Sequence, residues 1–323
     1  MISKIQNIKQ EVAKVVVGQE KMIDSLLIAL LCEGHILIEG VPGLAKTTTV
    51  NALSKALGLS FKRAQFTPDL LPSDILGAEI YDPQNNQFKI KKGPIFTNLL
   101  LADEINRAPA KVQSALLEAM QEKQITLGET TYALPKPFLV MATQNPIEQE
   151  GTYPLPEAQV DRFMLKLLVD YPTPEEEMMI MDRMIEHQPA QLQTVLPPEQ
   201  LQQIQALVKN IHMSPKIKEY IVNIIFATRD PKRFGINYKI RNKSRSLGHY
   251  IEHGASPRAS LALNISARAY ALIKHRSYVI ADDIKSIAYD ILRHRITPSY
   301  EAEADELNSD SIIKEILNNI EVP

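Results

Sequence analysis

The sequence predicts an α/β protein: a doubly wound, parallel, five-stranded sheet followed by a smaller all-helical domain. Three observations lead to this prediction. Short, continuously apolar segments recur through the first part of the chain, as in strands that are covered on both faces. Amphipathic helical patterns separate these segments, as expected when parallel strands are joined by helical crossovers. The composition then changes near residue 186, and only helical patterns follow residue 201.

The first part of the chain contains the elements of such a sheet in alternating order. Two amphipathic helices are predicted within residues 1–32, joined near residues 17–19. The five strand candidates are His35–Glu39, Phe61–Thr67, Asn98–Asp103, Phe138–Thr143 and Phe163–Asp170, and the helices between them include Thr47–Leu57 and Val112–Met120. Two segments interrupt the alternation, and we predict inserted hairpins at about residues 78–96 and 125–137.

The predicted organisation has two domains. Residues 1–185 form the α/β domain, and residues 186–200, rich in Gln and Pro, form a linker. Residues 201–323 form a helical domain with helices at 217–228, 260–274, 281–293 and 311–320. Within this domain, residues 229–245 carry seven Lys or Arg against one Asp. We expect a solvated loop there, with a docking patch for an acidic partner as the alternative.

Composition excludes several classes of protein. Lys and Arg number 36 against 38 Asp and Glu, so no global positive field attracts nucleic acid, which is not expected as a partner. The one cysteine, Cys32, cannot form an intramolecular disulfide or a thiolate metal cluster. The longest apolar runs, of about seven residues, fall short of the ~20 that span a bilayer. We therefore expect a soluble, cytoplasmic protein without a membrane partner.

A glycine-containing loop between the first strand and the following helix is the strongest chemical signal. It reads Gly40-Val41-Pro42-Gly43-Leu44-Ala45-Lys46-Thr47-Thr48. In a phosphate-binding loop, backbone N–H groups and the helix N-terminus hold the phosphates, Lys46 reaches the β- and γ-phosphates, and Thr47 holds Mg²⁺. The general pattern has glycine at the position of Ala45, so we expect Ala45 to keep a negative φ.

Two acids end the third predicted strand, in Leu99-Leu-Leu-Ala-Asp103-Glu104. The carboxyl ends of parallel strands are where open α/β sheets bind ligands. There, Asp103 can orient the water ligands of the metal, and Glu104 can accept the proton of the attacking water. A solvated strand end is the alternative, but it would not require both acids after this loop.

Three further polar residues stand at positions suited to phosphate chemistry. Asn145 closes the fourth strand and could hold the attacking water, although Asn also suits a turn before Pro146. Arg162 precedes the fifth strand, and Arg258 opens a helix of the second domain. Each arginine could neutralise charge on the transferred phosphoryl group, whereas the simpler alternative is a surface salt bridge.

These motifs together resemble the AAA+ ATPases, and more narrowly the MoxR-type AAA+ ATPases. The resemblance covers nearly the whole chain. Its motifs are Val16-Val-Gly18-Gln19, the phosphate-binding loop, Ala102-Asp-Glu-Ile-Asn-Arg-Ala-Pro109, Ala142-Thr-Gln-Asn-Pro146, Leu155-Pro-Glu-Ala-Gln159, Gly254-Ala-Ser-Pro-Arg258 and the segment from Arg293 to Glu303. An alanine before the loop lysine is usual in this family.

The resemblance implies a ring, expected to be a hexamer, with ATP bound between neighbouring subunits. It implies that Val17 and Gly18 contact adenine and that Lys46, Thr47, Asp103, Glu104 and Asn145 act within one subunit. Arg162 would act in trans as an arginine finger, and Arg258 would be a second sensor in the helical lid, in cis or in trans. The two hairpins match inserts that face the ring axis or a partner.

The family also implies a task. MoxR-type ATPases resemble chaperones that remodel or activate partner complexes, often together with von Willebrand factor A-domain proteins. We therefore predict Mg²⁺-dependent ATP hydrolysis coupled to such remodelling. Two alternatives remain open: a motor stimulated by nucleic acid, against which the net charge of −2 argues, and an assembly scaffold gated by nucleotide, against which Glu104 argues.

Overall fold

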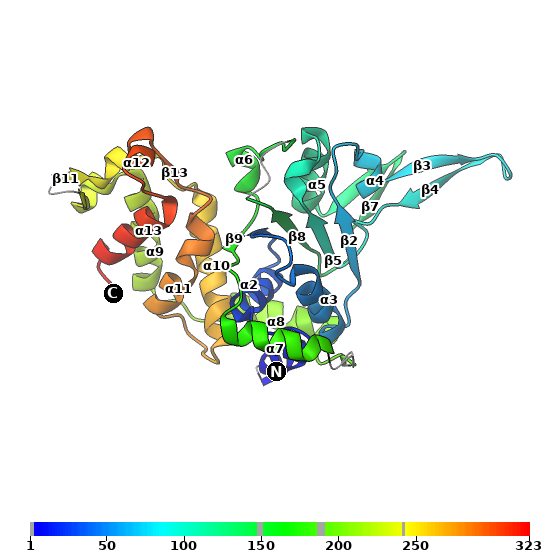
Figure 1. Cartoon of the computed structure of the whole chain (residues 1–323), viewed down its shortest axis with the longest axis horizontal. Coiled ribbons are helices and arrows are strands. Elements are labelled where there is room, and N and C mark those ends of the chain that lie inside the picture. Colours follow the sequence, from blue (N-terminus) through cyan, green and yellow to red (C-terminus); the bar gives the residue numbers. More distant parts are fainter. Residues whose placement is uncertain (1–2, 147–150, 186–190, 241–242) are drawn as a thin grey trace. The chain divides into compact units, whose positions relative to one another are not determined.

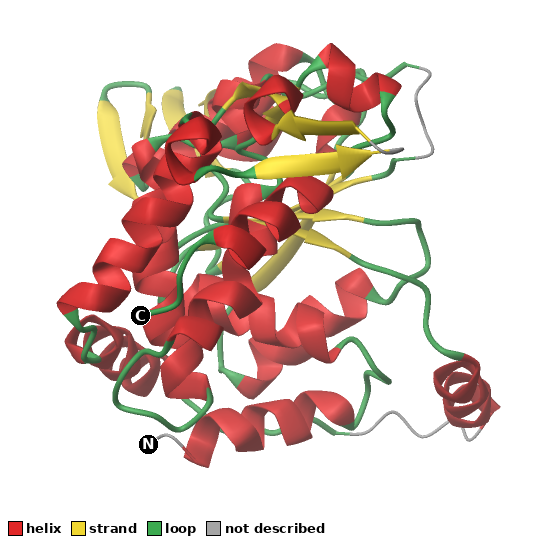
Figure 2. Ribbon diagram, turned by 90° about the vertical axis from the view of Figure 1, so that its left-hand side faces the viewer, coloured by secondary structure: helices red, strands yellow, loops and turns green. Residues whose placement is uncertain are grey.

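The computed structural model describes residues 3–146, 151–185, 191–240 and 243–323. These residues divide into two compact units, Met1–Gln205 and Ala206–Pro323. Helices and strands of both units are shown in Figures 1 and 2. In the part of the chain that is described, no helix combines the length and the apolar character needed to cross a membrane.

A five-stranded parallel sheet forms the centre of the first unit, as the sequence predicts. Its strands are β1 (Ile36–Glu39), β2 (Phe61–Gln65), β5 (Leu99–Asp103), β8 (Leu139–Gln144) and β9 (Leu165–Leu168). They are arranged in the order β2-β5-β8-β1-β9, and every neighbouring pair is parallel. All five carboxyl ends therefore lie at one edge of the sheet.

Helices cover both faces of this sheet (Figure 1). On one face, α5 (Ala110–Glu122) packs on alternate strand residues in a buried core that includes Leu37, Leu100, Ala102, Val140 and Ala142. On the other, α2 (Glu20–Leu31) packs against β1 and β9, and α3 (Lys46–Ala56) against β2 and β5, with α1 (Ser3–Ala13) beside α3. Burial on both faces explains why the central strands β1, β5 and β8 contain continuous apolar runs.

Two antiparallel hairpins occupy the inserted segments. The first is β3 (Gly77–Asp82) with β4 (Gln87–Lys92), preceded by α4 (Pro72–Leu76), and it projects far from the sheet (Figure 1). The second is β6 (Gln124–Leu127) with β7 (Thr130–Ala133). The Lys92 ammonium lies 4.9 Å from the ring centre of Phe96 and 4.7 Å from that of Tyr132. The base of the first hairpin therefore packs against the second.

Four further helical elements follow β5 in the chain: η1 (Ile105–Arg107), α6 (Glu157–Val160), α7 (Pro174–Ile185) and α8 (Pro198–Asn210), the last of which extends past Gln205, where the first unit ends. Helix α8 begins inside the segment expected as a linker, residues 186–200, of which residues 186–190 lie outside the described part. Its Gln205 side chain donates to the Leu30 carbonyl oxygen at 2.7 Å, which anchors this part of α8 to the first unit.

The second unit is mainly helical but not all-helical, which corrects the prediction for the second domain. Its helices are α9 (Pro215–Arg229), α10 (Pro257–Ile273), α11 (Ala281–Leu292), α12 (Tyr300–Ala304) and α13 (Ser309–Asn319), with short turns η2 (Pro231–Phe234) and η3 (Leu247–Tyr250). The basic segment expected as a loop contains most of the hairpin β10 (Asn237–Ile240) and β11 (Lys243–Ser246). A second short pair joins β12 (Ile251–His253) to β13 (Thr297–Pro298). Such short, polar strands lack the apolar alternation that identifies strands in a sequence.

A buried histidine fixes the start of β1, immediately before the phosphate-binding loop. The ring of His35 accepts a hydrogen bond from the Val140 N–H at Nδ1 (3.0 Å), so Nε2 carries the proton and donates to the Met120 carbonyl oxygen (3.2 Å). The pKa of His35 is lowered to about 4, mainly by burial; the hydrogen bond to Met120 opposes this shift, and the charge of nearby Lys123 adds to it. The fold therefore requires the neutral ring.

Acidification should destabilise the first unit through this histidine. The unfolded chain takes up the proton near the ordinary pKa of 6.5, whereas the folded chain takes it up only near 4, so the free energy of unfolding falls between these values. Urea unfolding of wild type and of His35→Gln should be compared at about pH 7 and about pH 5. Over this range, the free energy of unfolding of wild type should fall by about 2 kcal/mol more than that of His35→Gln. His253→Gln, which changes an exposed histidine, is the control. Equal pH slopes for wild type and His35→Gln would contradict this assignment.

Candidate nucleotide-binding site

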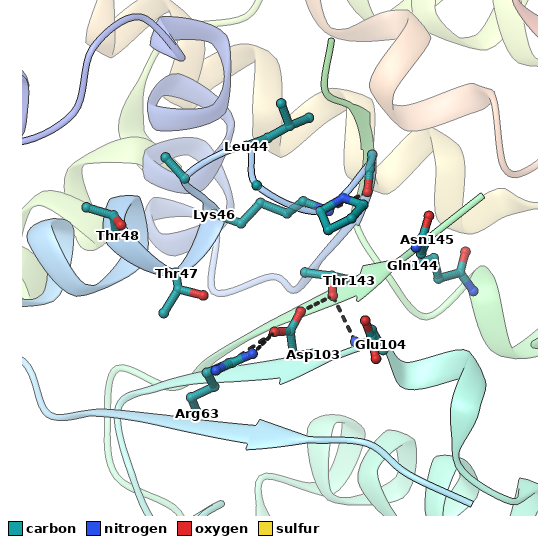
Figure 3. Close-up of a pocket in the computed structure, with 14 residues that line it drawn as sticks. Leu44, Lys46, Thr47, Thr48, Arg63, Asp103, Glu104, Thr143, Gln144 and Asn145 are labelled. Atoms are coloured by element: carbon teal, nitrogen blue, oxygen red, sulfur yellow. Dashed lines mark hydrogen bonds and ion pairs between the residues drawn. The ribbon is translucent and has the colours of Figure 1, made fainter. Parts of the chain in front are cut away.

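A pocket of about 390 Å³ lies where the phosphate-binding loop meets the carboxyl ends of the parallel strands (Figure 3). It gathers most of the predicted site residues and several that were not predicted. The lining residues are Gly40, Pro42, Gly43, Leu44, Ala45, Lys46, Thr47, Thr48, Arg63, Asp103, Glu104, Thr143, Gln144 and Asn145. The convergence follows from the topology, because β1, β2, β5 and β8 all end at this edge.

The loop wraps closely around the N-terminus of α3. A Cβ on Gly40 would lie 2.9 Å from the Val169 carbonyl oxygen, so glycine is required there by the neighbouring backbone. Ala45, the residue before α3, has φ 53°, which corrects the expectation of a negative φ. This left-handed conformation costs a residue with a Cβ about 1 kcal/mol in steric strain. Glycine would adopt the backbone conformation of Ala45 more readily.

Lys46 points along the loop, and its ammonium donates to the Gly40 carbonyl oxygen at 2.5 Å. Burial lowers the pKa of Lys46, while the charges of Asp103 and Glu104 act in the opposite direction. A partly desolvated ammonium beside backbone N–H groups at a helix start is suited to anionic phosphate groups.

Thr143 positions both acids at the end of β5. Its hydroxyl donates to Asp103 Oδ1 at 2.6 Å and accepts from the Glu104 N–H at 2.9 Å. Glu104 itself has φ 57°, a left-handed conformation that is uncommon for a residue with a side chain. The backbone turn at this point directs the two carboxylates into the same pocket (Figure 3).

Side chains from two further segments hold the carboxylates. On β2, Arg63 donates to Asp103 Oδ2 from Nε (3.0 Å) and Nη2 (2.6 Å), and Gln65 donates to Glu104 Oε2 at 2.7 Å. Arg107 donates to the same oxygen of Glu104 at 3.1 Å. Sequence analysis missed Arg63, Gln65 and Thr143. A signal was available, because these polar residues stand near the carboxyl ends of strands that flank or pair with β5.

The remaining predicted residues occupy different places. Asn145 is buried, with 8% of its surface exposed, and it lines the pocket directly after β8. Val41 is not among the described lining residues, although its loop neighbours are. Gly18 lines a second pocket of about 300 Å³ with residues of α1 and α2, and Val17 is not among the described residues that line it.

Neither predicted arginine lines the first pocket among the residues described there. Arg162 is exposed just after α6, in the first unit. Arg258 is the second residue of α10 in the second unit, and its N–H donates to the Ser256 side chain at 3.2 Å.

The donor groups fit a hard divalent cation. The hydroxyl of Thr47 and the carboxylate of Asp103 line the same pocket and offer oxygen ligands, which Mg²⁺ prefers. Within the described residues, no group of three or more His, Cys, Asp or Glu could enclose a metal ion. A cation here would take its other ligands from phosphate and water, as Mg²⁺ does in nucleotide sites.

Comparison with known proteins agrees with this geometry. The family model "ATPase family associated with various cellular activities (AAA)" matches residues 35–165, and "AAA lid domain" matches residues 247–316. Chaperone MoxR1 of Mycobacterium tuberculosis is 46% identical over 97% of this chain and 81% of its own length. Protein MoxR of Paracoccus denitrificans is 32% identical over 91% and 89%, respectively.

A solved structure is similar over the whole chain. It comes from Cytophaga hutchinsonii and is described, provisionally, as an ATPase. It shares 50% sequence identity with a TM-score of 0.93, over 100% of this chain and 96% of the other.

Proposed function

Because the chain belongs to the MoxR-type AAA+ ATPases, we propose that it hydrolyses ATP with Mg²⁺ in a ring and uses this reaction to remodel a partner protein. ATPase activity follows from the family. One observation carries the more detailed proposal: Lys46, Thr47, Asp103 and Glu104 converge on a single pocket at the helix N-terminus. A lysine, a hydroxyl and two acids in this arrangement are the parts that phosphoryl transfer to water requires.

In this proposal each residue has a distinct role. Backbone N–H groups of residues 43–48 and the Lys46 ammonium bind the phosphates. Thr47 and Asp103 would hold Mg²⁺, directly or through water, and the cation supplies neutralisation of phosphate charge. Glu104 accepts a proton from the attacking water, and Asn145 holds that water. Val17 and Gly18 contact adenine, and Arg258 senses the nucleotide from the lid.

The ring proposal draws support from Arg162. The pocket already contains the groups proposed to bind the phosphates and to activate the attacking water. Arg162, an exposed arginine of the same unit, is not among the described residues that line it. A cation on the surface of one subunit can complete the site of a neighbour in a closed head-to-tail ring, which we propose to be a hexamer.

The remodelling role is proposed from the relatives and the inserts. One relative is named a chaperone. In the chain, the hairpins β3–β4 and β6–β7 directly precede β5 and β8, whose carboxyl ends line the pocket, and the two hairpins pack against each other. We propose that the hairpins transmit nucleotide-dependent movement to a partner complex in the cytoplasm. The expected partner is a von Willebrand factor A-domain protein or another complex that is remodelled.

Specific ATPase activity measured against protein concentration tests the completed-ring proposal. With Mg²⁺ and no added partner, activity per subunit should rise with concentration, because sites between subunits form only on assembly. Sedimentation at the same concentrations should show the assembled species increasing in parallel. A constant, nonzero activity down to concentrations at which the protein sediments as a monomer would contradict a site shared between subunits.

A further inference from the structure

Arg63 makes an unusual contact at the centre of the site (Figure 3). Two guanidinium nitrogens, Nε and Nη2, donate to the same oxygen, Asp103 Oδ2, at 3.0 and 2.6 Å. Nη2 also donates to the Gln65 side chain at 2.8 Å. Because Asp103 Oδ1 accepts the Thr143 hydroxyl at 2.6 Å, both carboxylate oxygens of Asp103 are already hydrogen-bonded.

Stability does not account for this pair. The Arg63 side chain is 50% exposed and that of Asp103 19%, and ion pairs so accessible to water contribute little to folding. The guanidinium is permanently charged, and strand pairing places Arg63 and Gln65 on the same side of β2, beside β5. A positive charge thus lies against the carboxylate of Asp103, which lines the same pocket as Thr47.

A divalent cation bound to Asp103 would meet this positive charge. The cation and the guanidinium would both bind the lone pairs of Asp103 Oδ2, and their positive charges repel each other at contact distance. The two cannot share Oδ2 in the geometry shown. Because the Arg63 side chain is half exposed, it can rotate toward solvent or along the pocket wall without disrupting the core.

We propose that Arg63 is a positioning residue that competes with the divalent cation for Asp103 and thereby sets how much cation is needed to load the site. The inference rests on the proposed function, in which Asp103 and Thr47 hold Mg²⁺. Loading of the cation then requires Arg63 to leave Asp103, and its hydrogen bond to Gln65 is broken in the same movement.

Binding of Mn²⁺ in the presence of saturating ADP tests the competition directly. Free Mn²⁺ is measured by electron paramagnetic resonance, and ADP affinity in EDTA is measured by calorimetry. Arg63→Gln should bind Mn²⁺ about tenfold more tightly, because one positive charge is removed near the cation. Its ADP affinity in EDTA should stay within about twofold of wild type, because Arg63 contacts the acid and not the phosphate-binding loop.

Two further variants sharpen the test. Lys62→Gln removes the same charge from the adjacent, exposed position of β2, and it should leave Mn²⁺ affinity unchanged. Arg63→Lys keeps the charge but cannot reproduce the paired hydrogen bonds, so it should give an intermediate Mn²⁺ affinity. Circular dichroism establishes that each variant is folded.

The outcomes separate this inference from the function on which it rests. Unchanged or weaker Mn²⁺ binding by Arg63→Gln would overturn the competition. Weaker ADP binding by Arg63→Gln in EDTA would overturn it too, and would make Arg63 a phosphate ligand. If Asp103→Asn left Mn²⁺ affinity at the wild-type value, the cation site itself would be misassigned, and the proposed function would fail together with the inference.

Discussion

Replacing Glu104 with glutamine should lower kcat for ATP hydrolysis by about 10²- to 10⁴-fold, the usual contribution of a general base. ATP affinity should stay within about threefold of wild type, because the amide keeps the size and shape of the carboxylate while it loses the charge and the basicity. The structure explains why binding survives. Gln65 and Arg107 both donate to one oxygen, Oε2, and an amide oxygen can accept the same two hydrogen bonds.

Single-turnover hydrolysis and equilibrium binding of ATP should both be measured on Glu104→Gln. Glu118→Gln is a matched control, since it makes the same change at an exposed position of α5. Hydrolysis at the wild-type rate would show that Glu104 is not the base. Loss of ATP binding together with hydrolysis would indicate instead that the pocket had been damaged.

The sequence predicted the sheet well because burial leaves a clear signature. The three central strands, β1, β5 and β8, are buried, so each contains a continuous apolar run between helical patterns, whereas the outer strand β2 is mostly exposed and polar. The loop at residues 40–48 and the acids Asp103 and Glu104 could likewise be identified, because each motif is contiguous in the chain. Parallel topology then determines that these motifs meet at one edge.

Other features depend on information that a contiguous motif does not contain. The contacts of Arg63, Gln65 and Thr143 with the two acids arise from strand order and register, which bring residues about forty positions apart into hydrogen-bonding distance. The backbone of Ala45 is set by the loop around it, and the expectation of a negative φ was therefore wrong. The hairpin β10–β11 consists of mostly charged and polar residues, so its pattern is that of a loop.

Arg162→Ala should reduce kcat by about 10³-fold or more if Arg162 is the finger that stabilises the transferred phosphoryl group. Binding of ATP should be little affected, because Arg162 is not among the described residues that line the pocket of its own chain. Lys111→Ala, which removes a positive charge from an exposed position of α5, is the control and should retain activity. The rate alone, however, does not tell whether Arg162 acts within its own subunit or on the neighbouring one.

Mixing two inactive variants answers that question. In a ring assembled from equal amounts of Arg162→Ala and Glu104→Gln subunits, about a quarter of the interfaces combine an intact Glu104 with an intact Arg162 from the neighbour. If Arg162 acts in trans, the mixture should therefore regain up to about a quarter of wild-type activity under random assembly. If Arg162 acts in cis, every site lacks either its base or its arginine, and the mixture should stay as inactive as its parts. A silent mixture with normal ring assembly would thus contradict the shared site, whereas recovered activity would locate each active site between two subunits.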